Sequence, residues 1–171
     1  MFERPLAALA ALLVSAPAAL ALTLSGPAEV VDSDLLLMDG YRVYLVGVES
    51  IESGQDCRID GRPWDCYAPA VRALQTIVDE GLVTCEVLSG PNRLRQATAL
   101  CRVNGEDIGE RLVRAGFGLT IPAETEAYET AQAEAQAAGV GLWQGLFFAP
   151  AEWRTANAIF ADRPAFRPVA P

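Results

Sequence analysis

The chemistry open to this chain is limited by a residue type that it lacks. Its 171 residues include no histidine, which excludes Ser-His and Cys-His nucleophile systems and any histidine-ligated metal. Hydrolysis would therefore depend on a carboxylate cluster that holds a hard cation through oxygen ligands, with arginines to bind an anionic substrate. The 22 acidic residues and the 13 basic residues, all of them arginine, supply both kinds of group.

The four cysteines are expected to form disulfides rather than to act as nucleophiles or zinc ligands. An even count is typical of an exported chain, whereas a zinc site would show a C-x-x-C pair or histidine, and neither is present. Four cysteines allow three pairings. Proximity in sequence favours one disulfide across a short loop and one between neighbouring strands, with the pairs Cys57–Cys66 and Cys85–Cys101.

The first 21 residues have the layout of a secretory signal peptide. A basic residue, Arg4, precedes an apolar run, and a small-x-small sequence ends at Ala21, after which we expect cleavage. A membrane anchor is the alternative, but Ser15 and Pro17 interrupt a run that falls short of the roughly 20 apolar residues a spanning helix needs. We therefore expect an exported protein, periplasmic or extracellular, with no membrane span after cleavage.

The net charge of -9 describes an acidic protein. Affinity for DNA or RNA comes largely from cationic side chains that contact phosphates. This charge balance therefore argues against tight, non-specific binding of nucleic acid, unless the arginines are concentrated in one cleft.

The pattern along the chain predicts strands first and helices later. From 28 to 48, short apolar runs flank Asp39-Gly40, a dipeptide typical of hairpins. Residues 49–66 are polar and glycine-rich, which predicts a long surface loop. Apolar residues at helical spacing predict an amphipathic helix over Tyr67–Glu80, and residues 82–103 predict two strands joined by a turn.

Two further helices are expected, one over Glu106–Ala115 and one between Thr125 as N-cap and Gly139 as C-terminal stop. The order of elements predicts an α+β, mainly β domain over residues 22–154, namely an OB-fold: a five-stranded, partly open Greek-key barrel with three packed helices. A Pro-rich tail is expected over 155–171. Aromatic side chains before it are expected to pack over the barrel: Trp143, Phe147, Phe148 and Trp153.

Several short motifs occur in an order and at a spacing that resemble the thermonuclease (staphylococcal nuclease) family. They extend from Pro27 to Arg154 and read VVDSDLLL, DGYRVYLVGVESIE, GRPWDC, NRLRQATALCRVNGEDI, GVGLWQG and PAEWR. Each motif alone is weak, but their order and the placement of the four cysteines argue against a chance match. The resemblance implies the OB barrel, which the strand order also predicts, and calcium-dependent hydrolysis of phosphodiesters in DNA or RNA.

The resemblance also implies which residues would act. Asp34 falls on a calcium ligand of the family, and Glu49 falls on a calcium-binding aspartate. Ser50 stands beside it where the family has Thr or Ala, and Glu52 falls on the glutamate proposed as general base. Without the resemblance, Asp34 would be interpreted as a turn residue, and Glu49 and Glu52 as solvated loop charges.

Two positions that resemble the family's catalytic arginines are Tyr44 and Gln96. Preorganised donors of this kind are each commonly worth about 10²-fold in rate, or roughly 3 kcal/mol, so their loss would leave little activity. Arg42 is a candidate substitute, because residues two apart on a strand face the same side, about 6.7 Å apart. Arg95 would point away from the side of Gln96 unless the preceding turn shifts the register.

Two functions stay open at this point. The first is an exported, calcium-dependent nuclease, weakened or lost through the Tyr44 and Gln96 replacements, with nucleic acid as its partner. The second is a non-catalytic OB-fold binding module that binds a protein or another component of the cell envelope. The retained carboxylates favour the first, and the acidic charge favours the second.

Overall fold

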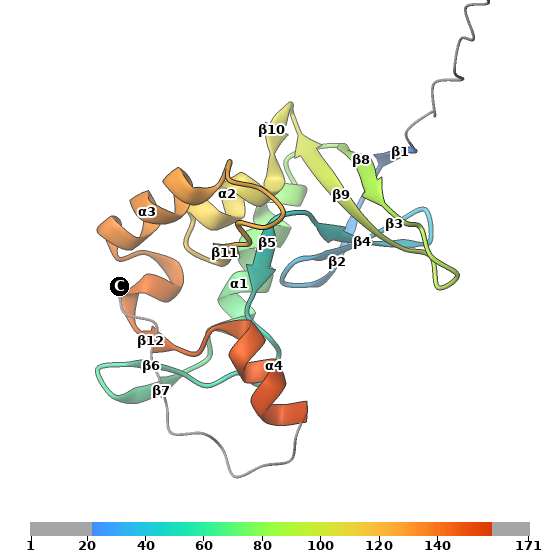
Figure 1. Ribbon diagram of the computed structural model, residues 1–171. Helices are drawn as coiled ribbons and strands as arrows, with labels where there is room; N and C mark the ends of the chain where they lie inside the picture. Colours follow the sequence, from blue (N-terminus) through green and yellow to red (C-terminus); the bar gives the residue numbers. More distant parts are fainter. Residues whose placement is uncertain (1–21, 159–171) are drawn as a thin grey trace, which may run out of the picture.

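A computed structural model describes residues 22–158, so the expected signal peptide and residues 159–171 of the expected tail lie outside the described residues. The described part is mixed α+β and mostly strands (Figure 1). Its main sheet runs in the spatial order β1 (Thr23–Gly26), β8 (Val83–Ser89), β9 (Gln96–Val103), β4 (Tyr41–Leu45), β3 (Leu35–Met38) and β2 (Glu29–Asp32), with β10 (Glu106–Asp107) also paired to β9.

This sheet curls into a half-barrel. The strands β1 and β2 stand at its two edges, yet only two residues separate them in sequence. All neighbouring pairs are antiparallel except β4 and β9, which run parallel. The turn between β3 and β4 uses Asp39 and Gly40 with positive φ of 48° and 74°, the backbone conformation that favours this dipeptide in tight hairpins. The hairpin prediction is confirmed.

Alternation along β4 sets the orientation of the residues expected to matter. Val43 and Leu45 are buried, whereas Arg42 and Tyr44 are exposed, because successive side chains on a strand point to opposite faces. The expectation that Arg42 and Tyr44 share a face is confirmed.

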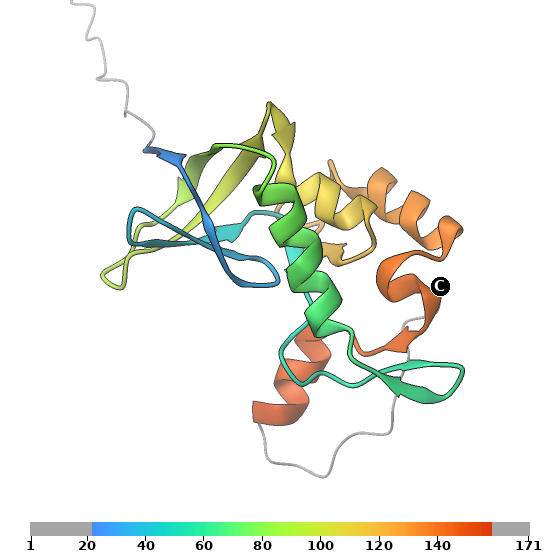
Figure 2. The ribbon, with the colours of Figure 1, turned by 180° about the vertical axis from the view of Figure 1, so that it is seen from behind.

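Four α-helices lie in the described part, one more than expected: α1 (Tyr67–Val78), α2 (Ile108–Arg114), α3 (Glu129–Ala138) and α4 (Pro150–Ala158), with the 3-10 helix η1 (Gly141–Gln144) after α3. Figure 2 shows α1 crossing beside the curled sheet, with α4 near its lower end. Helix α3 begins four residues after Thr125, and Gly139 ends it with a φ of 61°. Helix α4 runs to Ala158, so residues 155–158 of the expected tail are helical.

The segment over 49–66 was expected to be a loop, but it contains strands. After β5 (Val48–Ser50), a hairpin forms from β6 (Cys57–Ile59) and β7 (Arg62–Trp64), turning at Asp60-Gly61 with positive φ at both residues. Strand β11 (Gly118–Thr120) pairs with β5, and β12 (Leu146–Phe147) pairs with β6. The loop prediction was therefore wrong in part, although the same Asp-Gly signal had been present in the sequence.

Both expected disulfides are confirmed, Cys57–Cys66 and Cys85–Cys101. The second joins directly opposed residues of β8 and β9. Disulfides persist in oxidising compartments, so this is a non-cytoplasmic protein. Within residues 22–158, no helix is both long and apolar enough to cross a membrane.

Candidate functional site

An open cleft of about 490 Å³ lies over the exposed face of β4. Strand β5, the turn after β2 and helix α4 complete its walls. Among the residues that the structure describes, five carboxylates and two guanidinium groups line it, together with one exposed tyrosine, one threonine and four apolar residues: Asp32, Asp34, Glu49, Glu52, Glu124, Arg42, Arg154, Tyr44, Thr98, Leu35, Leu45, Val48 and Ile121. The cleft is therefore strongly acidic, with two positive charges within it.

Local structure explains why the carboxylates converge. On β5, Val48 and Ser50 are buried and Glu49 between them points the other way, into the cleft. Glu124 reaches the cleft from the segment after β11, and its carboxylate accepts a hydrogen bond of 2.8 Å from the backbone N–H of Gly47. Asp34 lies in the turn after β2, so three separate parts of the chain place carboxylates in the cleft.

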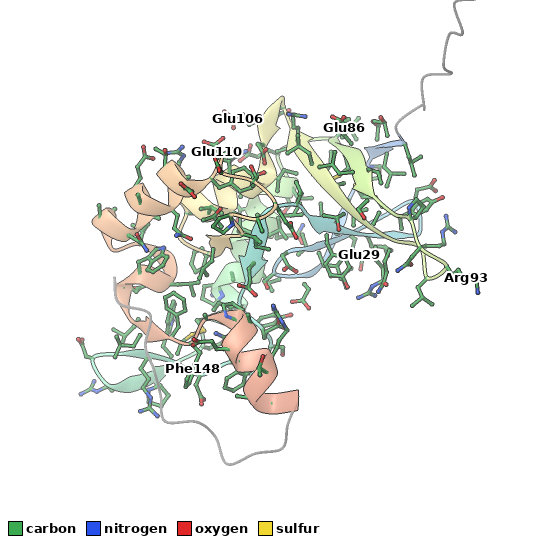
Figure 3. All side chains as sticks on the ribbon, in the orientation of Figure 1. Glu29, Glu86, Arg93, Glu106, Glu110 and Phe148 are labelled. Atoms are coloured by element: carbon green, nitrogen blue, oxygen red, sulfur yellow. A yellow bond between two sulfur atoms is a disulfide. The ribbon has the colours of Figure 1, made fainter. Side chains whose placement is uncertain are left out.

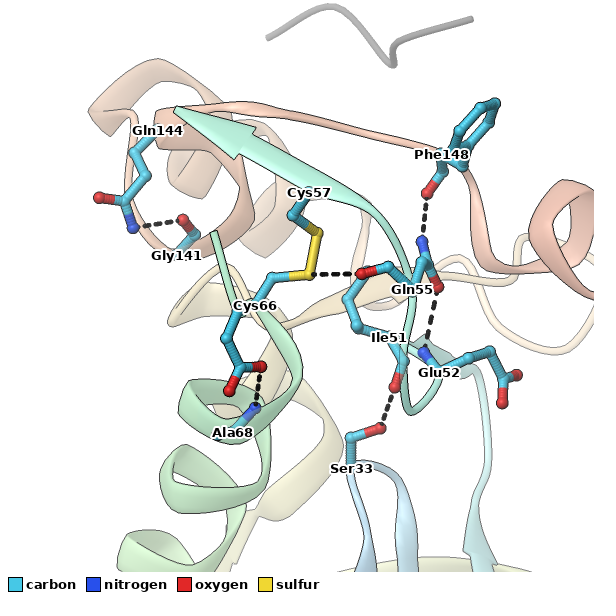
Figure 4. Close-up of a disulfide and its surroundings, with 11 residues drawn as sticks. Ser33, Ile51, Glu52, Gln55, Cys57, Cys66, Ala68, Gly141, Gln144 and Phe148 are labelled. Atoms are coloured by element: carbon cyan, nitrogen blue, oxygen red, sulfur yellow. Dashed lines mark hydrogen bonds between the residues drawn. A yellow bond between two sulfur atoms is a disulfide. The ribbon is translucent and has the colours of Figure 1, made fainter. Parts of the chain in front are cut away.

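The backbone at Glu52 is held by the buried side chain of Gln55. The Glu52 N–H donates to Gln55 Oε1 at 3.1 Å, and Gln55 Nε2 donates to the carbonyl of Phe148 at 2.7 Å (Figure 4). On the other side of this segment, Ser33 Oγ donates to the carbonyl of Ile51 at 2.7 Å. These bonds fix Glu52 relative to both the turn that carries Asp34 and the chain that leads into α4.

Arg154 of α4 bridges two of the cleft carboxylates. Its guanidinium donates to Glu49 Oε1 at 2.5 Å and to Glu52 Oε1 at 2.6 Å, and the pKa of the guanidinium is raised, first by its hydrogen bond with Glu52. The Arg154 side chain is 51% exposed. Ion pairs at this exposure of the arginine contribute only about 0–1 kcal/mol to stability.

Asp34 is the carboxyl group most perturbed by the cleft. Burial, and next the charges of Asp32 and Glu52, raise its pKa to about 6, against a smaller opposing effect of Arg154. The hydroxyl of Tyr67, the first residue of α1, interacts with Asp32 and Asp34. Its pKa is raised, first by burial and then by its interaction with Asp32. Uncompensated negative charge is thus concentrated around Asp34.

The cleft's oxygen donors are of the chemical type that Ca²⁺ prefers. As arranged, however, they do not form a cation site: residues 22–158 contain no group of three or more acidic or cysteine side chains placed to hold a metal ion. Arg154 lies between Glu49 and Glu52. The donor chemistry therefore fits a hard cation, while the positions do not fit one in this conformation.

Comparison with known proteins does not establish the function of the chain. No protein-family model matches the chain. The chain is similar to the succinoglycan biosynthesis protein ExoI of Rhizobium meliloti (strain 1021), with 29% identity over 141 residues, which cover 81% of this chain and 74% of that protein. The name of that relative assigns it to succinoglycan biosynthesis, and the similarity is too low to establish a common family.

The cleft brings together most of the residues expected from the sequence. Asp34, Glu49 and Glu52 line it, as does Arg42, the expected substitute cation. Ser50 is outside this group: it is 3% exposed, and its hydroxyl donates to the carbonyl of Phe117 at 2.8 Å, because adjacent residues of a strand face opposite sides.

Gln96, the first residue of β9, and Arg95 in the turn before it also lie outside the cleft lining. Gln96 pairs with Arg42 across the parallel strands, and its side-chain oxygen accepts a hydrogen bond from Asn92 at 2.8 Å. Arg95 has a positive φ of 57°, and its guanidinium stacks 4.3 Å from the ring centre of Tyr41. Neither position supplies a cation to the cleft.

The sequence had indicated no role for three charged residues of the cleft: Asp32, Glu124 and Arg154. Asp32 and Arg154 belong to the motifs VVDSDLLL and PAEWR, so their place in those motifs was the available signal. Glu124 had none, because it lies in an irregular segment whose path depends on packing. The expected packing role of the aromatic residues is confirmed for Trp143 and Phe147, which are buried edge to face.

The raised pKa of Asp34 leads to a prediction about stability. The folded state binds this proton more tightly than the unfolded state, whose Asp pKa is about 4. Stability is therefore lost as the pH rises from about 4 through 6. Asp34→Asn removes the penalty, so in chelator its free energy of unfolding at pH 7.5 should exceed that of the wild type by ~1–3 kcal/mol, and by close to zero at pH 3.5.

Urea unfolding at the two pH values measures this difference. Glu86→Gln, on the exposed face of β8, is the control for loss of one negative charge. Equal effects of Asp34→Asn at both pH values would show that burial and the neighbouring charges do not raise the pKa of this carboxyl.

Proposed function

We propose that this protein is an exported, thermonuclease-like OB-fold domain whose cleft hydrolyses phosphodiester bonds of single-stranded DNA or RNA slowly and in a calcium-dependent manner. The observation that carries the proposal is the convergence of Asp34, Glu49 and Glu52 with two guanidinium groups in one cleft. The meander β2-β3-β4 and its parallel pairing with β9 support the OB-fold.

The side chains of the cleft have separate tasks in this reaction. The Glu52 carboxylate accepts a proton from the attacking water, and its position is fixed through Gln55. Arg42 donates hydrogen bonds to the non-bridging oxygens of the phosphate, where negative charge grows during attack. The resemblance implies a calcium ion, which would add positive charge to this acidic cleft, although no group of the described residues is placed to hold it.

The same residues explain why the reaction is slow. Tyr44, 36% exposed at the cleft, can donate one hydrogen bond to a phosphate but adds no charge. The acidic surface outside the cleft does not attract an anionic substrate. Figure 3 shows Glu86, Glu106 and Glu110 at the end of the molecule away from α4. Without a cation in the cleft, a polyanion would be repelled.

A second candidate function is a non-catalytic binding module of the cell envelope. It is favoured by the pairing of Arg154 with Glu49 and Glu52, which occupies the carboxylates that catalysis needs. The relative from Rhizobium meliloti is named for succinoglycan biosynthesis, so succinoglycan is the first partner to test. Retention of succinoglycan by the protein, together with no cleavage of nucleic acid, would support this function.

The nuclease proposal is tested with the chain produced from its full-length sequence and purified with both disulfides formed. Fluorescent single-stranded DNA and RNA are incubated with calcium, and in parallel with a calcium chelator. We expect cleavage that is slow, saturable and abolished by the chelator. Absence of chelator-sensitive cleavage at high protein concentration would reject the nuclease function and leave the binding module.

A further inference from the structure

The turn between β8 and β9 carries exposed leucines at one end of the main sheet. Leu94, within the turn, is 73% exposed, and Leu88, the last residue but one of β8, is 56% exposed. Figure 1 shows this turn at the edge of the molecule, on the side away from α3. A single exposed leucine is common on a protein surface, but here two apolar side chains are in contact with water at the same end of the sheet.

The same turn is positively charged, although the whole chain has a net charge of -9. Residues 87–96 include two arginines and no acidic residue. Arg93 is exposed at the tip of the turn (Figure 3). Arg95 is also exposed, and its guanidinium stacks 4.3 Å from the ring centre of Tyr41. Exposed leucines therefore alternate with exposed cations in this turn.

The adjoining β3–β4 turn leaves this local charge unchanged. It contributes one carboxylate, that of Asp39, and one guanidinium, that of Arg42, which follows in β4. The Arg95 guanidinium donates to the backbone carbonyl of Asp39 at 3.1 Å, which keeps the two turns together. Charges farther than about 10 Å away are largely screened at 0.1 M salt, so a surface that meets this end of the protein is attracted by it.

Hydrogen bonds of Asn92 fix the shape of the turn. Its side-chain oxygen accepts from the backbone N–H of Leu94 at 2.9 Å and from that of Gln96 at 3.0 Å, and its side-chain nitrogen donates to the Gln96 side chain at 2.8 Å. Exposure of Leu94 is therefore a property of a closed turn. Docking through a preformed turn costs little conformational entropy.

We propose that the β8–β9 turn docks the protein on a bilayer of anionic lipids, with Leu88 and Leu94 entering the boundary between headgroups and acyl chains while Arg93 and Arg95 bind lipid phosphates. Such a surface accepts both kinds of side chain. Nucleic acid would pair with the arginines but leave the leucines in water, and a second copy docked turn to turn would bring like charges together. The proposal goes beyond the proposed function, because these four residues lie outside the cleft lining.

Co-sedimentation with lipid vesicles measures this docking. The protein is produced from its full-length sequence with both disulfides formed, and a mass measurement checks that all variants carry the same N-terminus. We expect the wild type to bind vesicles of equal parts phosphatidylglycerol and phosphatidylcholine, and to bind pure phosphatidylcholine far less. Leu94→Ser should weaken binding to the anionic vesicles about 10-fold, and Arg93→Gln about 5-fold, the effect of one cation at an anionic surface.

Leu82→Ser is the matched control for Leu94→Ser. Leu82 is also 73% exposed, but it precedes β8 and so lies at the opposite end of that strand, after Asp79 and Glu80. Its substitution should leave vesicle binding unchanged. Arg114→Gln, on α2, is the control for loss of one positive charge and should likewise bind as the wild type does.

The remaining outcomes each decide against the lipid surface. Equal vesicle binding by the wild type and Leu94→Ser, or equal binding to anionic and neutral vesicles, would overturn the proposal. Binding of single-stranded DNA that Arg93→Gln weakens, without vesicle binding, would assign the turn to nucleic acid instead. A dimer in analytical ultracentrifugation that Leu94→Ser dissociates, again without vesicle binding, would assign it to self-association. None of these results depends on cleavage, so the nuclease function stands or fails separately.

Discussion

Replacing Glu52 with glutamine is expected to lower kcat for calcium-dependent cleavage by about 10³-fold, within the range typical for removal of a general base. Glutamine keeps the size and hydrogen-bonding shape of the side chain but cannot accept a proton from water. The fold should be little affected, because the bond between Gln55 and this residue uses the backbone N–H of Glu52. The exposed ion pair of the Glu52 side chain with Arg154 contributes only about 0–1 kcal/mol. Initial rates on single-stranded DNA at saturating calcium measure the effect.

The control for Glu52→Gln is Glu86→Gln, which removes one negative charge outside the cleft and should leave the rate unchanged. A variant that retained more than a tenth of the wild-type kcat would remove Glu52 from the reaction.

The residues that sequence predicted well are those positioned by local rules. Strand alternation was enough to put Arg42 and Tyr44 on one face. The Asp39-Gly40 turn then brings β3 and β4 together, so that Leu35 stands opposite Tyr44 and Asp34 lies next to the cleft. The resemblance to the thermonuclease pattern selected Asp34, Glu49 and Glu52, and the cleft contains all three.

The residues that sequence missed are positioned by long-range packing. Arg154 lies 102 residues from Glu52 and 105 from Glu49, and its approach depends on how α4 is anchored. The Phe148 carbonyl before α4 is held by Gln55, and the Phe148 and Trp153 rings lie 6.3 Å apart. No periodic pattern reports contacts of this kind, so the place of Arg154 in the motif PAEWR was the available signal for it.

Gln96 shows a different limit. Counting residues along a motif places it correctly in β9, opposite Arg42, but the side chain is held by Asn92 in the turn before the strand. The cleft is lined instead by Thr98, which stands opposite Tyr44. Of the two positions that resemble the family's arginines, only Tyr44 therefore faces the site directly.

That difference leads to the second large expected effect. Tyr44→Arg should raise kcat/KM for single-stranded DNA by about 10²-fold, because it adds a charged donor at the position where negative charge develops on the phosphate. Stability should change little, since the side chain is on the exposed face of β4. Gln96→Arg alone should raise kcat/KM less than 10-fold, since that position lies outside the cleft lining.

Tyr44→Phe is the control for this gain, because it removes the hydroxyl without adding charge, and its rate should be no higher than that of the wild type. Gain of activity only when both Tyr44→Arg and Gln96→Arg are present would show that the two positions act together despite the binding of Gln96 to Asn92. Full activity of the wild type, unchanged by any of these substitutions, would show that Tyr44 has no part in phosphate binding.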